Sequence, residues 1–408
     1  MRGRVSHYKK ITKILHGCSV HLFQKRVRYI YVKKREDGRR MKFFSFNGKI
    51  KKTMLVVPLL AMTVFPCLTG AEGVSNQELA KPASVSDDTY KATEIGKYGV
   101  EPELLDSKTF IDPHITGTDR AIILDVMKDI PAEERTNVVY IRDDGEIFAN
   151  KPELLKQWSN AEQIGENLFK TKEGQTIAAP KQTCDLTQSF STQNVSCAPS
   201  DGPYRKVQSN TGYSWFSGYV YLPSQNKGQM HDENKPGGNG DTAHIYAGGI
   251  AANEVDAGFF HQPTNDNWAM FIRQNGYSKG AVFESGQTIF LKFYVPTSDK
   301  VALYAAGSIV GSSQKDYTVV RDVRGWNTSG YNQSIKRSTT IASKDGSPHS
   351  GSFINGVHWY NSYIGTSSTN NSPWTTSSQT AGYCNVPSSQ VTASFVNPGE
   401  ETVNIRVP

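Results

Sequence analysis

The stretches GDTAHIYAGGIAANEVDAGFFHQPTNDNWAMFIR (240–273) and SGQTIFLKFYVPTSDKVALYAAG (285–307) decide the fold of this chain. Both contain short runs in which apolar side chains alternate with other side chains, and Gly, Asn, Pro and Asp separate the runs. A period of two residues is typical of β-strands that bury one face. The runs with this character are 212–223, 243–250, 254–262, 267–273, 287–296, 300–310, 316–323, 350–364, 390–396 and 401–407. Because no helical pattern lies between them, residues 184–408 are predicted to form an antiparallel β-sandwich of the jelly-roll kind in a mainly β protein.

The alternation also predicts which side chains face the core in four of these strands. The inward residues are Phe216, Val220, Leu222, Val255, Ala257, Phe259, Trp268, Met270, Ile272, Ile289, Leu291, Phe293 and Val295. The outward residues include Trp215, Tyr219, Tyr221, Glu254, Asp256, Phe260, Gln262, Arg273, Lys292 and Tyr294.

If these four strands are neighbours in one sheet, their outward residues form one ligand-binding surface. Aromatic ring faces can stack on sugars, and the charged groups and the amide can form hydrogen bonds with sugar hydroxyls. The alternative interpretation is an ordinary sheet surface, or a face that the preceding residues cover.

The first 73 residues have the pattern of a leader and a signal peptide. An apolar run of about a dozen residues (54–66) follows several lysines and precedes small residues, which is typical of a secretory signal. The run is short for a membrane span, which needs about 20 apolar residues. Cleavage after Ala71 or after Gly73 is expected, so we predict a secreted protein, extracellular or cell-wall associated, with no membrane partner.

The segment before Met41 is unusual for an exported protein. KKREDGRR directly precedes Met41, and purine-only codons can encode Lys, Arg, Glu and Gly. Bacterial ribosome-binding sites are purine-rich, so we predict that translation starts at Met41. The alternative is a long basic n-region.

The net charge of +7 combines two unlike regions. Residues 1–71 have a net charge of +15, and residues 72–408 have a net charge of −8. A nucleic-acid-binding domain needs a basic surface on the folded part, so nucleic acid is not expected as a partner.

Residues 74–183 differ in character from the strands that follow. Residues 74–95 are polar and are predicted to be a flexible linker. Residues 96–183 are predicted to form a small α+β module, or alternatively a pro-region. Within it, helices are expected over 119–130 and 151–169, and a hairpin is expected over 137–150.

Three cysteines follow the signal region: Cys184, Cys197 and Cys384. Cys184 and Cys197 bracket a short polar stretch, which favours a local disulfide. Cys384 can instead pair with either of them across the sheet, and the sequence leaves this choice open.

Few motifs indicate catalysis or a cofactor. Glu254 and Asp256 would point to one face of a strand, as paired carboxylates do in glycosidases. The loop HDENKPGGNGD offers oxygen ligands of the kind that Ca²⁺ prefers, although a polar hairpin loop is the commoner explanation of such a stretch. Its possible ligands are Asp232, Glu233, Asn234, Asn239 and Asp241. No other cofactor is expected, because no P-loop, Rossmann or nucleophile-elbow motif is present.

Residues 200–320 resemble the exported YrpD-like proteins of Bacillus-type bacteria, a largely uncharacterised family. The resemblance rests on EVDAGF, on a P-T-x-D-x-W turn and on the aromatic strand QTIFLKFYVP. The stretch is also similar to the concanavalin A-like lectin and glucanase sandwich. Glucanases of that type carry E-x-D-x-(x)-E, but Gly258 or Phe259 stands here in place of the last acid. The resemblance therefore implies a secreted β-sandwich and no catalytic residues.

These observations favour non-catalytic binding of extracellular polysaccharide or cell-wall glycan. Two alternatives stay open: a glycan hydrolase or lyase that uses Glu254 and Asp256, and a structural or protein-interaction module without a small ligand.

Overall fold

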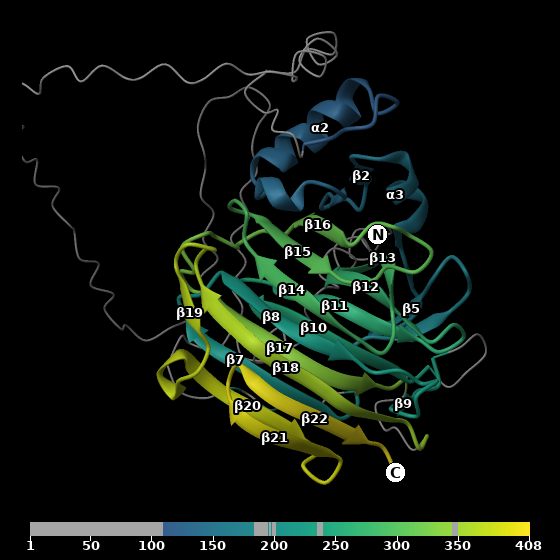
Figure 1. Cartoon of the computed structure of the whole chain (residues 1–408), viewed down its shortest axis with the longest axis vertical. Coiled ribbons are helices and arrows are strands. Elements are labelled where there is room, and N and C mark those ends of the chain that lie inside the picture. Colours follow the sequence, from purple (N-terminus) through teal and green to yellow (C-terminus); the bar gives the residue numbers. More distant parts are fainter. Residues whose placement is uncertain (1–108, 183–194, 196, 198–200, 235–239, 345–349) are drawn as a thin grey trace, which may run out of the picture. The chain divides into compact units, whose positions relative to one another are not determined.

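Two large β-sheets pack face to face in the computed structural model, which describes residues 109–182, 195, 197, 201–234, 240–344 and 350–408 (Figure 1). Sheet A contains, in order of neighbours, β2 (Ile147–Ala149), β1 (Val138–Ile141), β16 (Asp316–Asp322), β15 (Lys300–Ala306), β14 (Gln287–Tyr294), β8 (Trp215–Leu222), β18 (Phe353–Gly365), β22 (Glu400–Arg406) and β21 (Val391–Asn397), and β19 (Asn371–Pro373) and β9 (Met230–His231) pair with β18. Sheet B contains β20 (Thr380–Val386), β7 (Tyr204–Thr211), β17 (Ser334–Ala342), β10 (Thr242–Ile250), β11 (Glu254–Gln262), β12 (Asn267–Gln274), β13 (Gly276–Glu284) and β3 (Ser159–Asn160). The predicted mainly β sandwich is confirmed.

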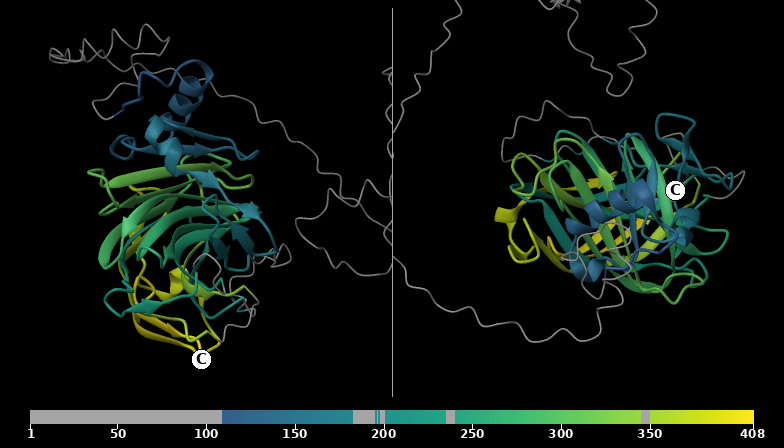
Figure 2. Two further views of the ribbon diagram at one scale, coloured as in Figure 1. Left: turned by 90° about the vertical axis from the view of Figure 1, so that its right-hand side faces the viewer. Right: turned by 90° about the horizontal axis from the view of Figure 1, so that it is seen from above.

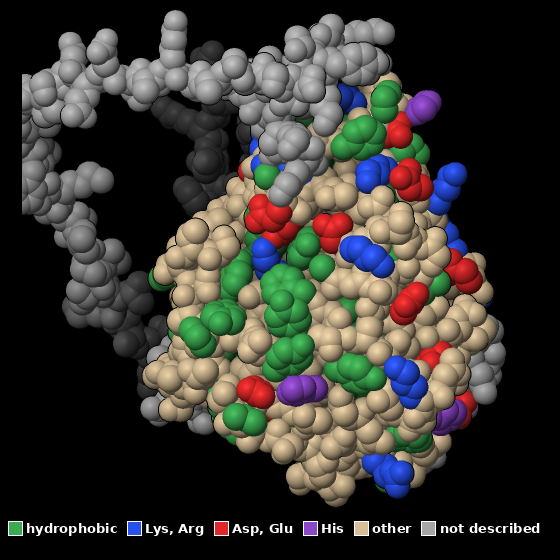
Figure 3. Space-filling model, viewed as in Figure 1, with side chains coloured by type: hydrophobic (Ala, Val, Ile, Leu, Met, Phe, Trp, Pro, Cys, Tyr) green, Lys and Arg blue, Asp and Glu red, His purple; other side chains and the backbone are tan. Residues whose placement is uncertain are grey.

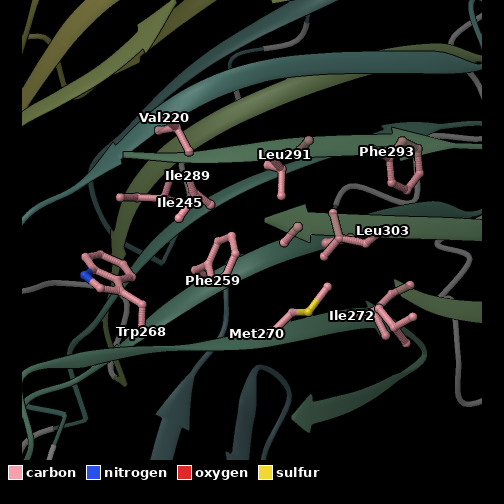
Figure 4. Close-up of a cluster of buried hydrophobic side chains, with 14 of the residues drawn as sticks. Val220, Ile245, Phe259, Trp268, Met270, Ile272, Ile289, Leu291, Phe293 and Leu303 are labelled. Carbon is pink, nitrogen blue, oxygen red and sulfur yellow. The ribbon is translucent and has the colours of Figure 1, made fainter. Parts of the chain in front are cut away.

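The core lies between the two sheets, where the predicted inward residues meet. Phe259 and Met270 of sheet B and Leu291 of sheet A belong to the same buried cluster (Figure 4). The other predicted inward residues lie in this cluster too. Burial of a large apolar side chain stabilises a fold by roughly 1.5–3 kcal/mol, so these alternating residues hold the two sheets together.

The described part of the predicted α+β module belongs to the sandwich. Strand β1 pairs in parallel with β16, and β3 pairs with β13, so this segment adds strands to both sheets. Helix α2 (Gly117–Lys128) packs on the outer face of sheet A (Figures 1 and 2). Sheet C, formed by β4 (Glu162–Gln163), β5 (Leu168–Lys170) and β6 (Thr176–Ala178), packs on the outer face of sheet B. The predicted boundary at residue 183 therefore does not separate two folding units.

The helix predicted over 151–169 is wrong beyond its first turns. Helix α3 spans only Pro152–Gln157, and strands follow it. Trp158 is buried, and its ring lies so close to Gly280 that a Cβ atom there would be 2.0 Å from it. The Ala161 amide then donates to the Tyr277 carbonyl at 2.8 Å. Tertiary contacts with β13 therefore override the helical pattern.

The disulfide joins Cys197 to Cys384 on β20. The predicted local pair of Cys184 and Cys197 is thus replaced by the long-range alternative. Cys184, the predicted leader and signal peptide, Met41 and the linker lie outside the described residues. No helix in the described ranges is long and apolar enough to cross a membrane.

Candidate functional site

The structure places the predicted ligand-binding residues on two different faces. Trp215, Tyr219, Tyr221, Lys292 and Tyr294 lie on β8 and β14 of sheet A. Glu254, Asp256, Phe260, Gln262 and Arg273 lie on β11 and β12 of sheet B. Strands β8 and β14 are not neighbours of β11 and β12. The prediction of one common surface is therefore wrong. Alternation shows which side chains share one face of a strand, but it does not show to which sheet the strand belongs.

The part of this set on sheet B is covered. Phe260 is fully buried in a cluster with Phe169 of sheet C. Arg273 donates hydrogen bonds to the Pro180 carbonyl and, at 2.8 Å, to Asn167 Oδ1. The 161–182 segment is thus fastened to this face by both apolar and polar contacts.

Glu254 and Asp256 form a buried ion-pair cluster with Lys336 of β17. Lys336 Nζ lies against Glu254 Oε1 and 2.5 Å from Asp256 Oδ1, and Gln182 donates to Asp256 Oδ2 at 3.1 Å. Burial opposes the charge on Lys336, but the two carboxylates outweigh it and raise the pKa of Lys336 above its usual range. Burial and the nearby Lys336 lower the pKa of Lys206 to about 8. Both carboxylates are therefore buried and paired, which does not favour the hydrolase alternative.

The α2 end of the sheet A face is also covered. Trp215 and Tyr294 pack in the α2 cluster and are 7% and 5% exposed. Glu134, which ends the 3₁₀ turn Ala132–Glu134, accepts a hydrogen bond from the Tyr294 hydroxyl at 2.7 Å and pairs with Lys292. These three predicted site residues therefore fasten the covering segment and are not open to a ligand.

Next to α2, a row of partly exposed aromatic side chains crosses four strands of sheet A, and Tyr304 at one end of the row packs against the α2 cluster. This aromatic band consists of Tyr304 on β15, Phe290 on β14, Tyr219 on β8, and Tyr360 and His358 on β18. Tyr219 is 38% exposed and the other four rings are half-buried. Figure 3 shows hydrophobic side chains gathered over these strands.

Strand register explains why the rings form one row. Tyr219 lies directly opposite Phe290 on one side and Tyr360 on the other. The Tyr219 and Tyr360 rings are stacked, with centroids 5.3 Å apart and planes at 16°. Tyr360 stacks in turn on His358, with centroids 4.9 Å apart. Four neighbouring strands at a spacing of about 4.8 Å give the band a length of roughly 14 Å.

The groups beside the middle of the band are polar and uncharged, and at one end Lys292 Nζ lies 5.5 Å from the centroid of the Tyr304 ring. Thr288 is exposed on β14, and Thr402 of β22 lies opposite His358. The Tyr221 hydroxyl donates to Gln229 Oε1 at 3.0 Å. Glu400, 3.8 Å from His358, supplies the carboxylate at this end. The band thus offers apolar ring faces with hydroxyl groups beside them.

Sequence reasoning found only part of this band. Tyr219 is among the predicted site residues, and Phe290 is outward by the same alternation because it lies between the inward Ile289 and Leu291. Tyr304, His358 and Tyr360 were missed. Tyr304 lies on β15, and His358 and Tyr360 lie on β18 between two register shifts, at Ile354/Val357 and at Tyr360/Tyr363, which interrupt the alternation in that strand.

The predicted calcium loop is built into the protein by other contacts. Asp232 pairs with His261 at 3.1 Å, and Asp241 accepts a hydrogen bond from Ser352 at 3.0 Å. Asn239 lies outside the described residues. Within the described ranges, no group of three His, Cys, Asp or Glu side chains is arranged to hold a metal ion.

His261 gives this region an expected pH dependence. The ring is fully buried between Asp232 at 3.1 Å and Asp266 at 3.2 Å. Burial disfavours its charge, but the two carboxylates prevail and raise the pKa of His261 from 6.5 to about 9. Because protonated His261 is favoured by the folded state, its protonation contributes fully to the free energy of unfolding below the pKa of the unfolded state. This contribution is lost as the pH rises through the pKa of the folded state. We expect wild type to lose about 3 kcal/mol between pH 6.5 and 9 through this group.

The measurement is urea unfolding of wild type and His261→Gln at pH 6 and pH 9. Lys206, whose pKa is lowered to about 8, acts in the opposite direction but is common to both proteins. The difference between them should therefore shrink at pH 9, and a constant difference would contradict the prediction.

A comparison with known protein families finds no match, and a comparison with curated sequences finds none either. Among solved structures, scytalido-glutamic peptidase in complex with a peptide-based transition state analogue has a TM-score of 0.32 at 8% identity, over 50% of this chain and 98% of that one. SCP-B, a member of the Eqolisin family of peptidases, has a TM-score of 0.28 at 7% identity, over 50% of this chain and 98% of that one. A protein of unknown function from Shewanella oneidensis MR-1 has a TM-score of 0.19 at 11% identity, over 46% of this chain and 79% of that one. TM-scores of this size carry no information on the activity of this chain.

Proposed function

We propose that this protein binds neutral polysaccharide, either extracellular or part of the cell wall, through the aromatic band. The observation that carries the proposal is the contiguous row of five partly exposed rings across β15, β14, β8 and β18. We further propose that the protein is secreted, because the expected signal peptide would direct export and the proposed glycan ligand lies outside the cell.

The shape and chemistry of the band favour a sugar chain. A pyranose ring has apolar faces formed by its C–H groups, and these meet the negative face of an aromatic ring favourably. Tyrosine supplies such a face at a small cost in conformational entropy. Tyr219 and Tyr360 lie on a rigid sheet, so little further ordering is needed on binding. The narrow row suits an extended chain that places successive sugars on successive rings.

The proposal is for binding without cleavage. The two carboxylates considered for catalysis lie on the other sheet, where the side chains of Glu254 and Asp256 are 6% and 1% exposed. Stacking needs no proton transfer, and the Glu400 carboxylate at one end of the band suits a neutral ligand better than a polyanion. The ligand class follows from the chemistry of the band and not from a fold resemblance.

The test is a pull-down on cellulose, chitin and purified peptidoglycan with wild type and a Tyr219→Ala/Tyr360→Ala double variant. Each ring contact contributes about 0.5–1.5 kcal/mol, so the double variant should bind about 5- to 150-fold more weakly. Tyr331→Ala is the matched control, because Tyr331 is 72% exposed and lies outside the band. Equal retention of wild type and the double variant, or no retention of wild type on any glycan, would overturn the proposal.

A further inference from the structure

A second site lies where the two sheets open at one end of the sandwich. A cleft of about 540 Å³ is bounded by the β1–β2 turn, the β12–β13 turn and the end of β16. Asp143, Asn160, Gln274, Asn275, Arg321 and Asp322 are among its lining residues. A volume of this size is typical of small-molecule sites. None of these residues belongs to the aromatic band.

Arg321 is the unusual group in this cleft. The side chain is 5% exposed and reaches from β16 of sheet A to β13 of sheet B. Its guanidinium donates to Ser278 Oγ at 3.1 Å and to the Gln274 carbonyl at 3.1 Å, and both acceptors are uncharged. Its Nε makes no hydrogen bond within the described part of the chain.

A comparison with Arg337 shows what Arg321 lacks. Arg337 is also buried, but its guanidinium lies 2.6 Å from the Glu401 carboxylate. No ion pair of Arg321 occurs among the described residues, although a buried charge normally has a partner. Burial accordingly lowers the pKa of Arg321 to about 10. The cleft wall therefore contains a desolvated positive charge whose Nε–H donor has no partner among the described residues.

We propose that this cleft binds the carboxylate group of a small organic acid, with Arg321 as the anion-binding residue. The planar guanidinium matches a carboxylate in shape and hydrogen-bond geometry. Asp143, Asp144 and Asp322 also line the cleft, and their charges disfavour a doubly charged ligand such as phosphate. A singly charged carboxylate compensates Arg321 with the least repulsion from these side chains.

The surroundings hold Arg321 in position for this role. Ser278 Oγ accepts from Arg321 and donates to Asn160 Oδ1 at 2.6 Å. Asn160 Nδ2 donates in turn to the Gly145 carbonyl of the β1–β2 turn. This chain of hydrogen bonds crosses the cleft wall, so Arg321 is oriented before a ligand arrives and little ordering is required on binding.

The test is calorimetric titration of the full chain with glucuronate, acetate, glucose and inorganic phosphate. Glucuronate and glucose share a sugar ring, so comparing them tests whether the carboxylate is required. Acetate tests whether a small carboxylate without a sugar ring is sufficient. We expect binding of glucuronate or acetate but not of glucose or phosphate. Arg321→Gln should weaken carboxylate binding by about 10- to 100-fold. Arg406→Gln is the control, because Arg406 is exposed at the end of β22, is not a lining residue of the cleft and should have an effect of less than about threefold.

A second variant keeps the test valid if Arg321→Gln does not fold. Asn275 is exposed at the β12–β13 turn and has a φ of 56°, a conformation that Asp also tolerates. Asn275→Asp should weaken carboxylate binding severalfold and leave the thermal melt unchanged. The Tyr219→Ala/Tyr360→Ala variant should bind carboxylates like wild type, which separates this site from the proposed glycan surface. Absence of carboxylate binding by wild type, preference for phosphate, or equal affinity of wild type and Arg321→Gln would overturn the proposal.

Discussion

Replacing Lys336 with methionine should lower the free energy of unfolding by about 3–5 kcal/mol, the range observed when one partner of a buried ion pair is removed. Lys336 is 2% exposed and contacts the carboxylates of both Glu254 and Asp256. Methionine fills a similar volume but leaves two buried carboxylates side by side without their shared countercharge. Urea unfolding monitored by tryptophan fluorescence would measure the loss.

Lys128→Met is the control for this prediction. Lys128 pairs with Asp125 on the surface of α2, where both side chains are well exposed. Exposed pairs of this kind contribute about 0–1 kcal/mol. A loss for Lys336→Met as small as that of the control would show that water reaches Glu254 and Asp256 in the folded protein.

Replacing Glu401 with glutamine should cost a similar amount, about 3–5 kcal/mol. Glu401 lies on β22 of sheet A and is fully buried. It accepts hydrogen bonds from Arg205 Nε at 2.9 Å and Arg337 Nη1 at 2.6 Å, both on sheet B. Its loss would leave two buried guanidinium groups between the sheets without a countercharge.

The neighbouring Glu400→Gln variant is a matched control, because Glu400 is 43% exposed on the opposite side of β22. A second measurement uses pH. Burial opposes the charge on Glu401, but Arg337 and Arg205 prevail and lower its pKa. The ionised Glu401 carboxylate therefore stabilises the folded state at pH values above the pKa of the unfolded state. This contribution is lost as the pH falls through the pKa of the folded state. Wild type should therefore lose more stability than Glu401→Gln below about pH 4.5, and equal losses would contradict the assignment.

The strands that alternate strongly could be predicted from the sequence, but β7, β13, β17 and β20 of sheet B could not. Strand β11 has the predicted bounds, because Val255, Ala257 and Phe259 mark its inner face clearly. Strands β7 and β17 were missed, although they lie side by side within sheet B. Their inward positions include Arg205 and Arg337, which interrupt the apolar pattern. Their countercharge, Glu401, lies on the other sheet, so the sequence around each arginine does not predict the pairing.

The composition of the candidate site depends on which strands are neighbours in a sheet, and the alternation of side chains does not predict this order. Tyr219 faces outward as predicted, but its neighbour Tyr360 comes from a strand far along the sequence. Glu254 and Asp256 also face outward from their strand, yet they belong to the opposite side of the sandwich. Each strand's faces could thus be assigned correctly while the composition of the surface could not.

The parallel pairing of β1 with β16 has a consequence for the rate of folding. The Tyr140 hydroxyl on β1 donates to Asp322 on β16, 182 residues further along the chain. Contacts between such distant segments require closure of long loops, which slows folding to the millisecond-to-second range. Strand β1 emerges from the ribosome first and has to wait for a partner that is synthesised much later. We therefore expect the sandwich to close only after most of the chain has been made.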